Sequence, residues 1–170
     1  MRTRTPVLLA IALTVGAVWL VGLVRGGGSA DPVRAAAVDP LARPRPARAL
    51  RVLHRWDRAR AAAWRRGDPR ALARLYVAGS AAGRRDVHEL SRWSRRGLRV
   101  TRLRQQVSEV RVVAVDGSRV VVLVSERTLG GIAVGPPGRA RLPSSAWARH
   151  RILFRRQGRV WRVVDAQPAR

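Results

Sequence analysis

Residues 99–127 constrain the fold more than any other part of this chain of 170 residues. Two valine-rich runs, residues 107–115 and 120–124, are joined through Asp116-Gly117. β-Branched residues favour strands, and an Asp-Gly pair between two such runs is a strong signal for a tight turn. The sequence therefore predicts an antiparallel β-hairpin in this stretch.

The register of this hairpin predicts that both of its faces are apolar. If Asp116 and Gly117 form the loop, Val115 lies opposite Ser118 and Val113 lies opposite Val120. One face then carries Val113, Val115, Val120, Val122 and Val124, and the other carries Val110, Val112, Ala114, Val121 and Leu123. A sheet with one wet face would alternate apolar with polar residues. We therefore expect helices on one face and a partner subunit or a concave cavity on the other.

The composition excludes several classes of chemistry. The chain has no cysteine, which rules out disulfides, zinc-thiolate sites and thiol nucleophiles. All 35 basic residues are arginine, and the net charge is +25. An excess without any lysine fits the coding bias of a GC-rich genome better than selection for phosphate binding, so we expect no nucleic-acid partner. Such a surface still attracts anionic lipid head groups in a salt-dependent way.

The N-terminal part predicts a membrane anchor followed by a tether. No charged residue occurs from Pro6 to Val24, and this run is long enough to cross a hydrocarbon core of about 30 Å. It exceeds the apolar region of about 7–15 residues in a cleavable signal peptide. Flanking arginines leave the orientation nearly undecided, and the short N-terminal tail favours a cytoplasmic N-terminus. We expect residues 1–25 to be the tail and single-pass anchor, 26–48 a flexible Gly- and Pro-rich tether, and 49–170 an extracytoplasmic domain.

Three helices are predicted at the start of this domain. Apolar residues recur at helical spacing over residues 50–66, and Gly67 follows at the C-terminal capping position. Asp68-Pro69 then supplies an N-cap and a proline at the first helical position, for a second helix that ends by Gly79. After a loop of small residues, Asp86 and Glu89 have the spacing of a capping box for a third helix, which Gly97 ends.

Strands make up the remainder of the domain. Residues 147–156 and 160–167 form a second predicted hairpin around Gln157-Gly158. The long connection 129–145 is expected to be either a mobile flap or two ragged strand ends around a turn. The fold class is therefore α+β: an N-terminal transmembrane helix, then three helices packed on a curved antiparallel sheet of about four strands.

This order of elements resembles the nuclear transport factor two-like superfamily. The resemblance covers residues 50–167 and includes the segments GDPRAL (67–72), RRGLRV (95–100) and RRQGRVWRV (155–163). It is strongest to membrane-tethered extracytoplasmic members from high-GC bacteria, of the kind that accompany mammalian-cell-entry lipid transport systems. The resemblance implies a cone with a cavity between helices and sheet, a scaffold used both by enzymes and by non-enzymatic modules.

Candidate polar residues for such a cavity occur on the first helix and on the first hairpin. His54 and Asp57 lie three residues apart on one helix face, where the resemblance implies cavity residues. Glu109 and Arg111 share a strand face, and Glu126 lies diagonally across from them in the predicted register. A solvated helix face and the wet end of a sheet are the alternatives. No set of His, Asp and Glu residues has metal-ligand spacing, and no cofactor is expected.

The second hairpin supplies the remaining catalytic candidates. A two-residue turn at Gln157-Gly158 places Phe154 opposite Trp161, Ile152 opposite Val163, and His150 opposite Asp165 on the inward face. His150 would then be a general base oriented by Asp165, or the two would form a partly exposed pair. The other expected cavity residues are the aromatics Tyr76, Trp93, Phe154 and Trp161, for which core packing is the alternative role.

These observations favour a non-enzymatic binding or scaffolding module of the cell envelope. One alternative is an enzyme of the isomerase, dehydratase or hydrolase type that uses the cavity. A weaker alternative is an arginine-rich nucleic-acid-binding domain on the cytoplasmic side. The expected partners are the membrane, through the single span and its anionic lipids, an unidentified envelope protein, and a second copy of the chain bound through the sheet.

Overall fold

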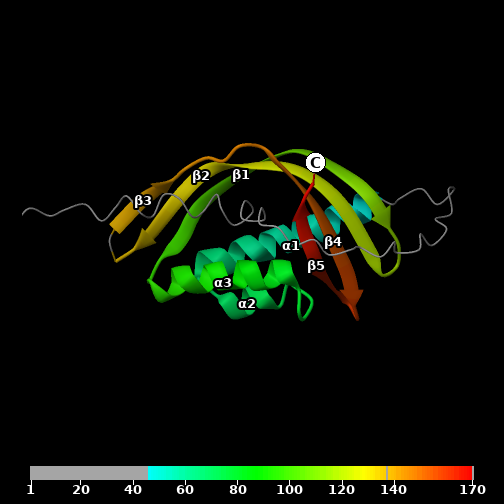
Figure 1. The fold of residues 1–170 in the computed structure, drawn as a ribbon, viewed down its shortest axis with the longest axis horizontal. Coiled ribbons are helices and arrows are strands. Elements are labelled where there is room, and N and C mark those ends of the chain that lie inside the picture. Colours follow the sequence, from blue (N-terminus) through cyan, green and yellow to red (C-terminus); the bar gives the residue numbers. More distant parts are fainter. Residues whose placement is uncertain (1–45, 137, 170) are drawn as a thin grey trace, which may run out of the picture.

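The computed structural model describes residues 46–136 and 138–169 as three helices and one five-stranded sheet (Figure 1). The elements are α1 (Pro46–Arg66), α2 (Pro69–Ala73), α3 (Ala81–Arg95), β1 (Arg99–Val115), β2 (Arg119–Gly135), β3 (Gly138–Leu142), β4 (Ala148–Gln157) and β5 (Val160–Pro168). The expected anchor and most of the expected tether lie outside the described residues. Among the described helices, none has the length and apolarity that a membrane span requires.

The sheet is antiparallel and arches over the three helices (Figure 1). Its strand order is β1-β2-β4-β5, and β3 pairs with the far end of β2. The expected α+β architecture with three helices on a curved sheet is therefore confirmed, with five strands where about four were expected. The additional strand, β3, comes from the long connection 129–145, which consists of strand ends around a turn.

The first hairpin forms, but its turn lies one residue further along the chain than expected. The backbone N–H of Asp116 donates to the carbonyl of Arg119, which leaves Gly117 and Ser118 as the loop. Oδ1 of Asp116 accepts hydrogen bonds from the backbone N–H groups of Ser118 and Arg119, each at 2.7 Å. These bonds lower the pKa of the Asp116 carboxyl. Val115 consequently pairs with Val120, and the predicted pairing with Ser118 is wrong.

Irregularities in β1 then change which of its side chains face the helices. Register shifts occur between Val112 and Ala114 and again between Val107 and Glu109, and each shift moves the following side chains to the other face. Val110, Val112 and Val115 pack against the core with Val120, Val122 and Val124. Val113, expected on that same face, is 48% exposed. The sequence shows two apolar faces, but a regular register assigns the residues of β1 to them incorrectly.

The second hairpin also departs from the expected register. Gln157 pairs with Val160, and a further shift lies between Leu153 and Phe154. As a result Phe154 pairs with Val163 and Ile152 pairs with Ala166, so the predicted pairs Phe154 with Trp161 and Ile152 with Val163 are wrong.

The expected capping residues are confirmed where α1 ends and α2 begins, but α1 begins at Pro46, before the expected 50–66 and inside the expected tether 26–48. Gly67 has a φ of +64° after α1, and the Asp68 side chain accepts from the N–H of Ala71 at 2.8 Å, as expected of the N-cap of α2. For α3 the expected capping box is wrong. The helix begins at Ala81, and its N-cap is Ser80, which accepts from the N–H of Gly83 at 3.1 Å. Asp86 therefore lies inside α3.

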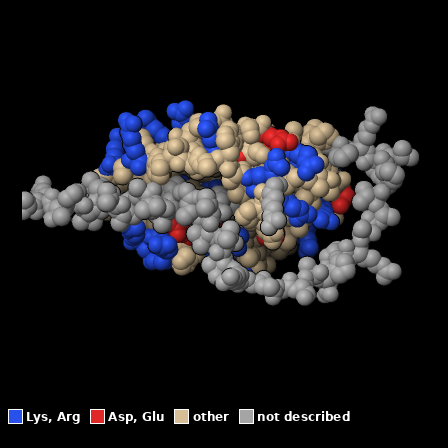
Figure 2. All heavy atoms as spheres, turned by 45° about the horizontal axis from the view of Figure 1, so that its top comes forward, with Lys and Arg blue, Asp and Glu red and all other residues tan. Residues whose placement is uncertain are grey.

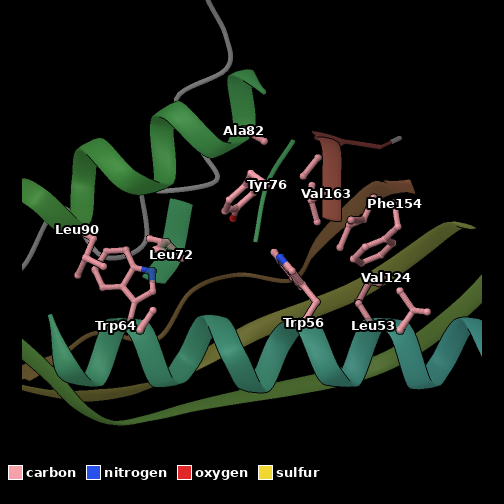
Figure 3. Close-up of a cluster of buried hydrophobic side chains, with 14 of the residues drawn as sticks. Leu53, Trp56, Trp64, Leu72, Tyr76, Ala82, Leu90, Val124, Phe154 and Val163 are labelled. Carbon is pink, nitrogen blue, oxygen red and sulfur yellow. The ribbon is translucent and has the colours of Figure 1, made fainter. Parts of the chain in front are cut away.

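Aromatic side chains fill the space between the helices and the sheet (Figure 3). The Trp56 ring meets the rings of Tyr76 and Phe154 edge-on, with centroids 6.2 and 5.9 Å apart. Trp64 packs against Trp93 at 6.4 Å. Side chains thus pack the space between helices and sheet in which the resemblance implies a cavity, as they do in protein cores.

The close approach of α3 to Tyr76 yields a test of this packing. A Cβ atom on Gly83 would lie 2.7 Å from Cβ and Cγ of Tyr76. Gly83→Ala should therefore lower the free energy of unfolding by about 1–3 kcal/mol, as overpacking does, although alanine favours helices by about 1 kcal/mol. Gly117→Ala is the control, because a Cβ there meets nothing within 4 Å. Urea unfolding that ranks the two variants equally would contradict this packing.

Candidate functional site

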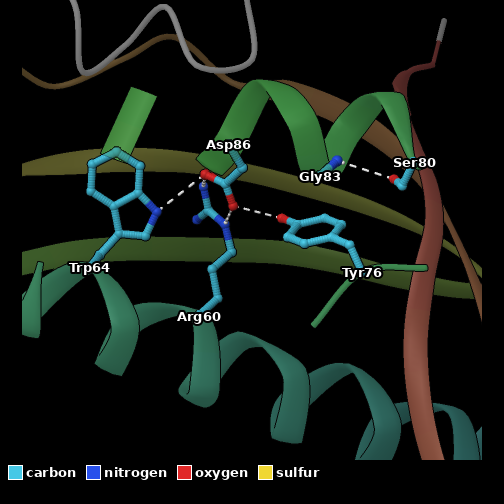
Figure 4. A network of polar contacts seen from close by, with 6 residues as sticks. All are labelled: Arg60, Trp64, Tyr76, Ser80, Gly83 and Asp86. Carbon is cyan, nitrogen blue, oxygen red and sulfur yellow. Dashed lines mark hydrogen bonds and ion pairs between the residues drawn. The ribbon is translucent and has the colours of Figure 1, made fainter. Parts of the chain in front are cut away.

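A buried polar cluster in the interior is centred on the carboxylate of Asp86 (Figure 4). Oδ2 accepts from Nε of Arg60 at 2.7 Å and from the hydroxyl of Tyr76 at 2.6 Å. Oδ1 accepts from Nη2 of Arg60 at 2.8 Å and from Nε1 of Trp64 at 3.1 Å. Arg60 is 8% exposed and Asp86 is 3% exposed. A carboxylate offers about four acceptor positions, so these four donors use the whole capacity of Asp86.

The cluster holds its members in fixed protonation states. Burial raises the pKa of the Tyr76 hydroxyl, and the neighbouring Asp86 carboxylate raises it further. Burial acts to lower the pKa of Arg60, but the Asp86 charge and the Tyr76 hydroxyl act against it, and the net pKa lies above the ordinary value. Tyr76 is therefore a neutral donor and Arg60 a permanent cation. Neither is poised to exchange a proton near neutral pH, as a general acid or base must be.

Two titratable groups of the sheet lie within reach of the Arg60 charge. His150 is 3% exposed on the concave face, and both burial and the Arg60 charge lower the pKa of its imidazole. Burial raises the pKa of the half-buried Glu126 carboxyl, partly against the effect of Arg60. Both shifts favour the neutral form of these side chains.

A pocket of about 140 Å³ opens beside this cluster, between α1 and the strands β1 and β2. Its lining consists of Asp57, Arg60, Ala61, Trp64, Arg65, Val100, Arg102, Leu103, Gln105 and Thr128. The buried side chains Trp64 and Val100 line its inner part, and the exposed side chains Arg65, Arg102 and Gln105 line its rim. This small pocket is the candidate binding site of the domain.

Of the candidate pair on the first helix, only one residue reaches the pocket. Asp57 lines it and is half-buried, whereas His54 is exposed. The structure therefore does not bring the imidazole and the carboxylate together in a shared cavity. Among the residues that the structure describes, no group of three or more His, Asp or Glu side chains is placed to hold a metal ion.

The candidates on the first hairpin lie on two different faces of the sheet. Glu109 pairs with Ser125, and its carboxylate lies 3.5 Å from Nη2 of the exposed Arg149. Arg111 is also exposed. Glu126 follows Ser125 directly and points to the concave face. The expected group of Glu109, Arg111 and Glu126 at one cavity mouth is wrong, because the irregularity between Val112 and Ala114, which lies between these residues and the turn, reverses the facing of Glu109 and Arg111.

The proposed dyad of His150 and Asp165 does not form. His150 pairs with Pro168, and Asp165 pairs with Leu153. Since His150 shares the concave face with Ile152 and Phe154, Leu153 and its partner Asp165 lie on the opposite face. The predicted pairing is wrong because the actual turn and the irregularity next to Phe154 shift the register.

The expected aromatic cavity residues belong to the packed core. Phe154 and Tyr76 are buried around Trp56, and Trp93 is buried against Trp64. Nε1 of Trp93 donates to the carboxylate of Glu89 at 2.9 Å. Trp161 is half-buried, with the Arg48 guanidinium 5.4 Å from its ring centroid.

Sequence reasoning missed the residues that matter most here, Arg60, Asp86 and Arg102. A signal for the first two was present. Arg60 lies four residues after Trp56 and four before Trp64, and Asp86 lies four before Leu90 and seven before Trp93. A charge at a position of the apolar stripe predicts a buried residue with a partner. For Arg102 the sequence holds no comparable signal.

Comparison with known proteins places the chain by fold. No protein-family model matches it, and no curated protein matches its sequence. Aln2 from a Streptomyces species is similar in structure, with 16% identity, coverage of 75% of this chain and 93% of that chain, and a TM-score of 0.51. For the intermembrane space region of the chloroplast protein ARC6, the identity is 16%, the coverages are 74% and 97%, and the TM-score is 0.50.

A further neighbour is an NTF2-like protein with a cystatin-like fold from Novosphingobium aromaticivorans, with 16% identity, coverages of 74% and 83%, and a TM-score of 0.45. At these identities the likeness is one of fold alone. Structural neighbours of this chain therefore include a protein described as NTF2-like with a cystatin-like fold, at low sequence identity. The membrane tether and the association with mammalian-cell-entry systems stay predictions.

Removal of the central carboxylate should destabilise the domain strongly. Asp86→Ala leaves a buried guanidinium without its counter-ion, which should lower the free energy of unfolding by about 3–5 kcal/mol. Tyr76→Phe removes one donor and should lower it by about 1.5–3 kcal/mol. Arg92→Ala is the control, because the Arg92–Glu89 pair is exposed on the arginine side and should contribute under about 1 kcal/mol. Equal unfolding midpoints for Asp86→Ala and Arg92→Ala would refute the central role of the cluster.

The buried imidazole should make stability depend on pH. The pKa of His150 is lower in the folded chain than in the unfolded chain, so the unfolded chain takes up the proton first as the pH falls through about 6.5. The contribution of the neutral His150 side chain to the stability of the fold is therefore present at neutral pH and is lost below about pH 6.5. We expect the free energy of unfolding of the wild type to fall more than that of His150→Phe between pH 7.5 and 5.5. Parallel pH profiles would contradict this prediction.

Proposed function

We propose that the domain is a non-enzymatic binding module of the cell envelope, held at the outer side of the membrane by residues 6–24. The observation that carries the non-enzymatic part of this proposal is the saturated Asp86 cluster inside a packed domain. The four acceptor positions of Asp86 are occupied by Arg60, Trp64 and Tyr76. No lone pair is left there to accept a proton from a substrate. The pocket beside the cluster can bind a ligand, but it contains no paired acid and base.

The enzyme alternative loses support from the same geometry. General acid–base catalysis requires groups that lie within hydrogen-bond reach of one substrate. His54 and Asp57 do not share the pocket, and His150 and Asp165 lie on opposite faces of the sheet. Aln2 and the ARC6 region share only the fold with this chain, so their names add no function.

The distribution of charge supports a position next to an anionic membrane. Basic side chains lie at many places on the face drawn in Figure 2, and acidic side chains at few. On the outer face of the sheet, Arg111 and Arg151 flank Leu123 and are exposed. Such arginines attract anionic lipids with little head-group selectivity. They also repel a second copy, so the homodimer through the sheet stays a prediction without support from this surface.

Topology provides the test of the envelope proposal. Alkaline phosphatase fused after Arg170 should be active in cells, because that enzyme matures only outside the cytoplasm. A fusion to a reporter that works only in the cytoplasm should be inactive at the same position. The reverse pattern would overturn the envelope proposal and would favour the cytoplasmic nucleic-acid alternative. Replacement of Leu8 and Leu9 by arginine serves as the control, since charges within the expected span should abolish export.

A further inference from the structure

The pocket between α1 and the start of β1 combines an apolar floor with a cationic rim. Trp64 and Val100 are buried and, together with the half-buried Leu103, supply the apolar surface. Arg65 and Arg102 stand at the rim and are exposed. The amide of Gln105 and the hydroxyl of Thr128 are the neutral polar groups of the lining. An apolar cavity with a few convergent polar groups is the usual form of a small-molecule site.

One rim residue occupies this position at a cost in backbone strain. Arg102 has a φ of +53°, and it is the one non-glycine residue with a positive φ among the described residues. It lies within the irregularity of β1 between Thr101 and Arg104. A bulge re-aims the side chain next to it, and strained residues of this kind concentrate at sites that contact ligands. A glycine at this position would avoid the strain but would remove the guanidinium from the pocket.

The charge of the lining selects for an anion. Three guanidinium groups and the single carboxylate of Asp57 line the pocket. Arg60 is already bound by Asp86 through two hydrogen bonds, which leaves Arg65 and Arg102 as the groups that can turn to a ligand. A guanidinium offers parallel donors that match the two oxygens of a carboxylate.

The size of the pocket limits the rest of the ligand. A volume of about 140 Å³ is close to that of an engineered apolar cavity, about 150 Å³, that binds benzene. A bare inorganic anion would leave the apolar floor in contact with water, and the part of a ligand that covers this floor is about the size of one ring. The floor therefore selects an apolar or aromatic body of about one six-membered ring.

From these observations we infer that the pocket binds a small organic carboxylate, with its ring or aliphatic body on Trp64, Val100 and Leu103 and its carboxylate held by Arg102. Arg65 and Gln105 complete the polar rim. This inference deepens the proposed binding function and rests on it. It assigns a ligand class to the module. It also explains the strained backbone at Arg102, which places the guanidinium at the pocket.

The test uses benzoate as the probe and the full-length chain in a non-ionic detergent, with isothermal titration calorimetry at pH 7. Benzoate should bind at least about tenfold more tightly than benzyl alcohol, which has the same ring without the charge, as expected for one charge-assisted hydrogen bond. Inorganic phosphate, which has the charge without the ring, should bind more weakly than benzoate as well. Equal binding of benzoate and benzyl alcohol, or no binding of benzoate, would overturn the inference.

Two substitutions at one position separate binding from folding. Arg102→Gln removes the charge and keeps the strain, whereas Arg102→Gly removes both. Both should weaken benzoate binding at least about tenfold, and Arg102→Gly should have an unfolding temperature no lower than that of the wild type. Arg104→Gln is the matched control, because Arg104 is exposed on the same strand outside the pocket lining. Unchanged affinity in the Arg102 variants would refute the assigned site.

The outcomes separate this inference from the envelope proposal. Benzyl alcohol could bind as tightly as benzoate, and Leu103→Trp could abolish the binding of both. The domain would then still be a binding module, but its ligand would be neutral. Only the ligand class would then be wrong. A cytoplasmic reporter pattern with intact, Arg102-dependent benzoate binding would instead remove the envelope position and leave the ligand class in place.

Discussion

Four hydrogen bonds onto one buried carboxylate hold the helical layer of this domain together. Asp86 of α3 receives Arg60 and Trp64 from α1, and it receives Tyr76 from the segment after α2. Tyr76 in turn forms a bridge with Val163 of β5, so the cluster also joins the helices to the sheet. A buried ion pair adds little net stability over an apolar pair, but it disfavours any packing that leaves one member alone. The cluster therefore specifies one arrangement of the helices.

This arrangement determines where a ligand can bind. The carboxylate of Asp86 is saturated, and the aromatics Trp56, Tyr76 and Phe154 pack the centre of the described domain between the helices and the sheet. The candidate pocket lies at one side, where α1 passes over the irregular start of β1. The same irregularity gives that space its distinctive group, the Arg102 side chain. Packing in the interior and the bulge in β1 thus act together to place the candidate site at the rim.

The sequence predicts the order of elements well and the facing of the strands poorly, for physical reasons. Caps such as Asp68-Pro69 and Gly67 act within a few residues, so local patterns locate α1 and α2. Strand facing depends on every bulge between a residue and its turn, and one shift reverses all later positions. That is why Glu109 and Asp165 lie on faces other than those expected. The capping box failed because the distant partner Arg60, not the local spacing, decides the role of Asp86.

The function of an arginine in this domain is indicated by its position in the structure and not by the overall arginine content. Most arginines of the domain are exposed, where a guanidinium meets water at little cost and its presence indicates little about function. Arg60 is buried and needs a counter-ion. Arg102 has a left-handed backbone conformation, which disfavours residues other than glycine. Both residues therefore carry a free-energy penalty at their positions. For Arg60, the ion pair with Asp86 offsets the penalty of burying the charge. For Arg102 no comparable partner within the described residues offsets the strain, which is the physical reason to seek its partner in a ligand.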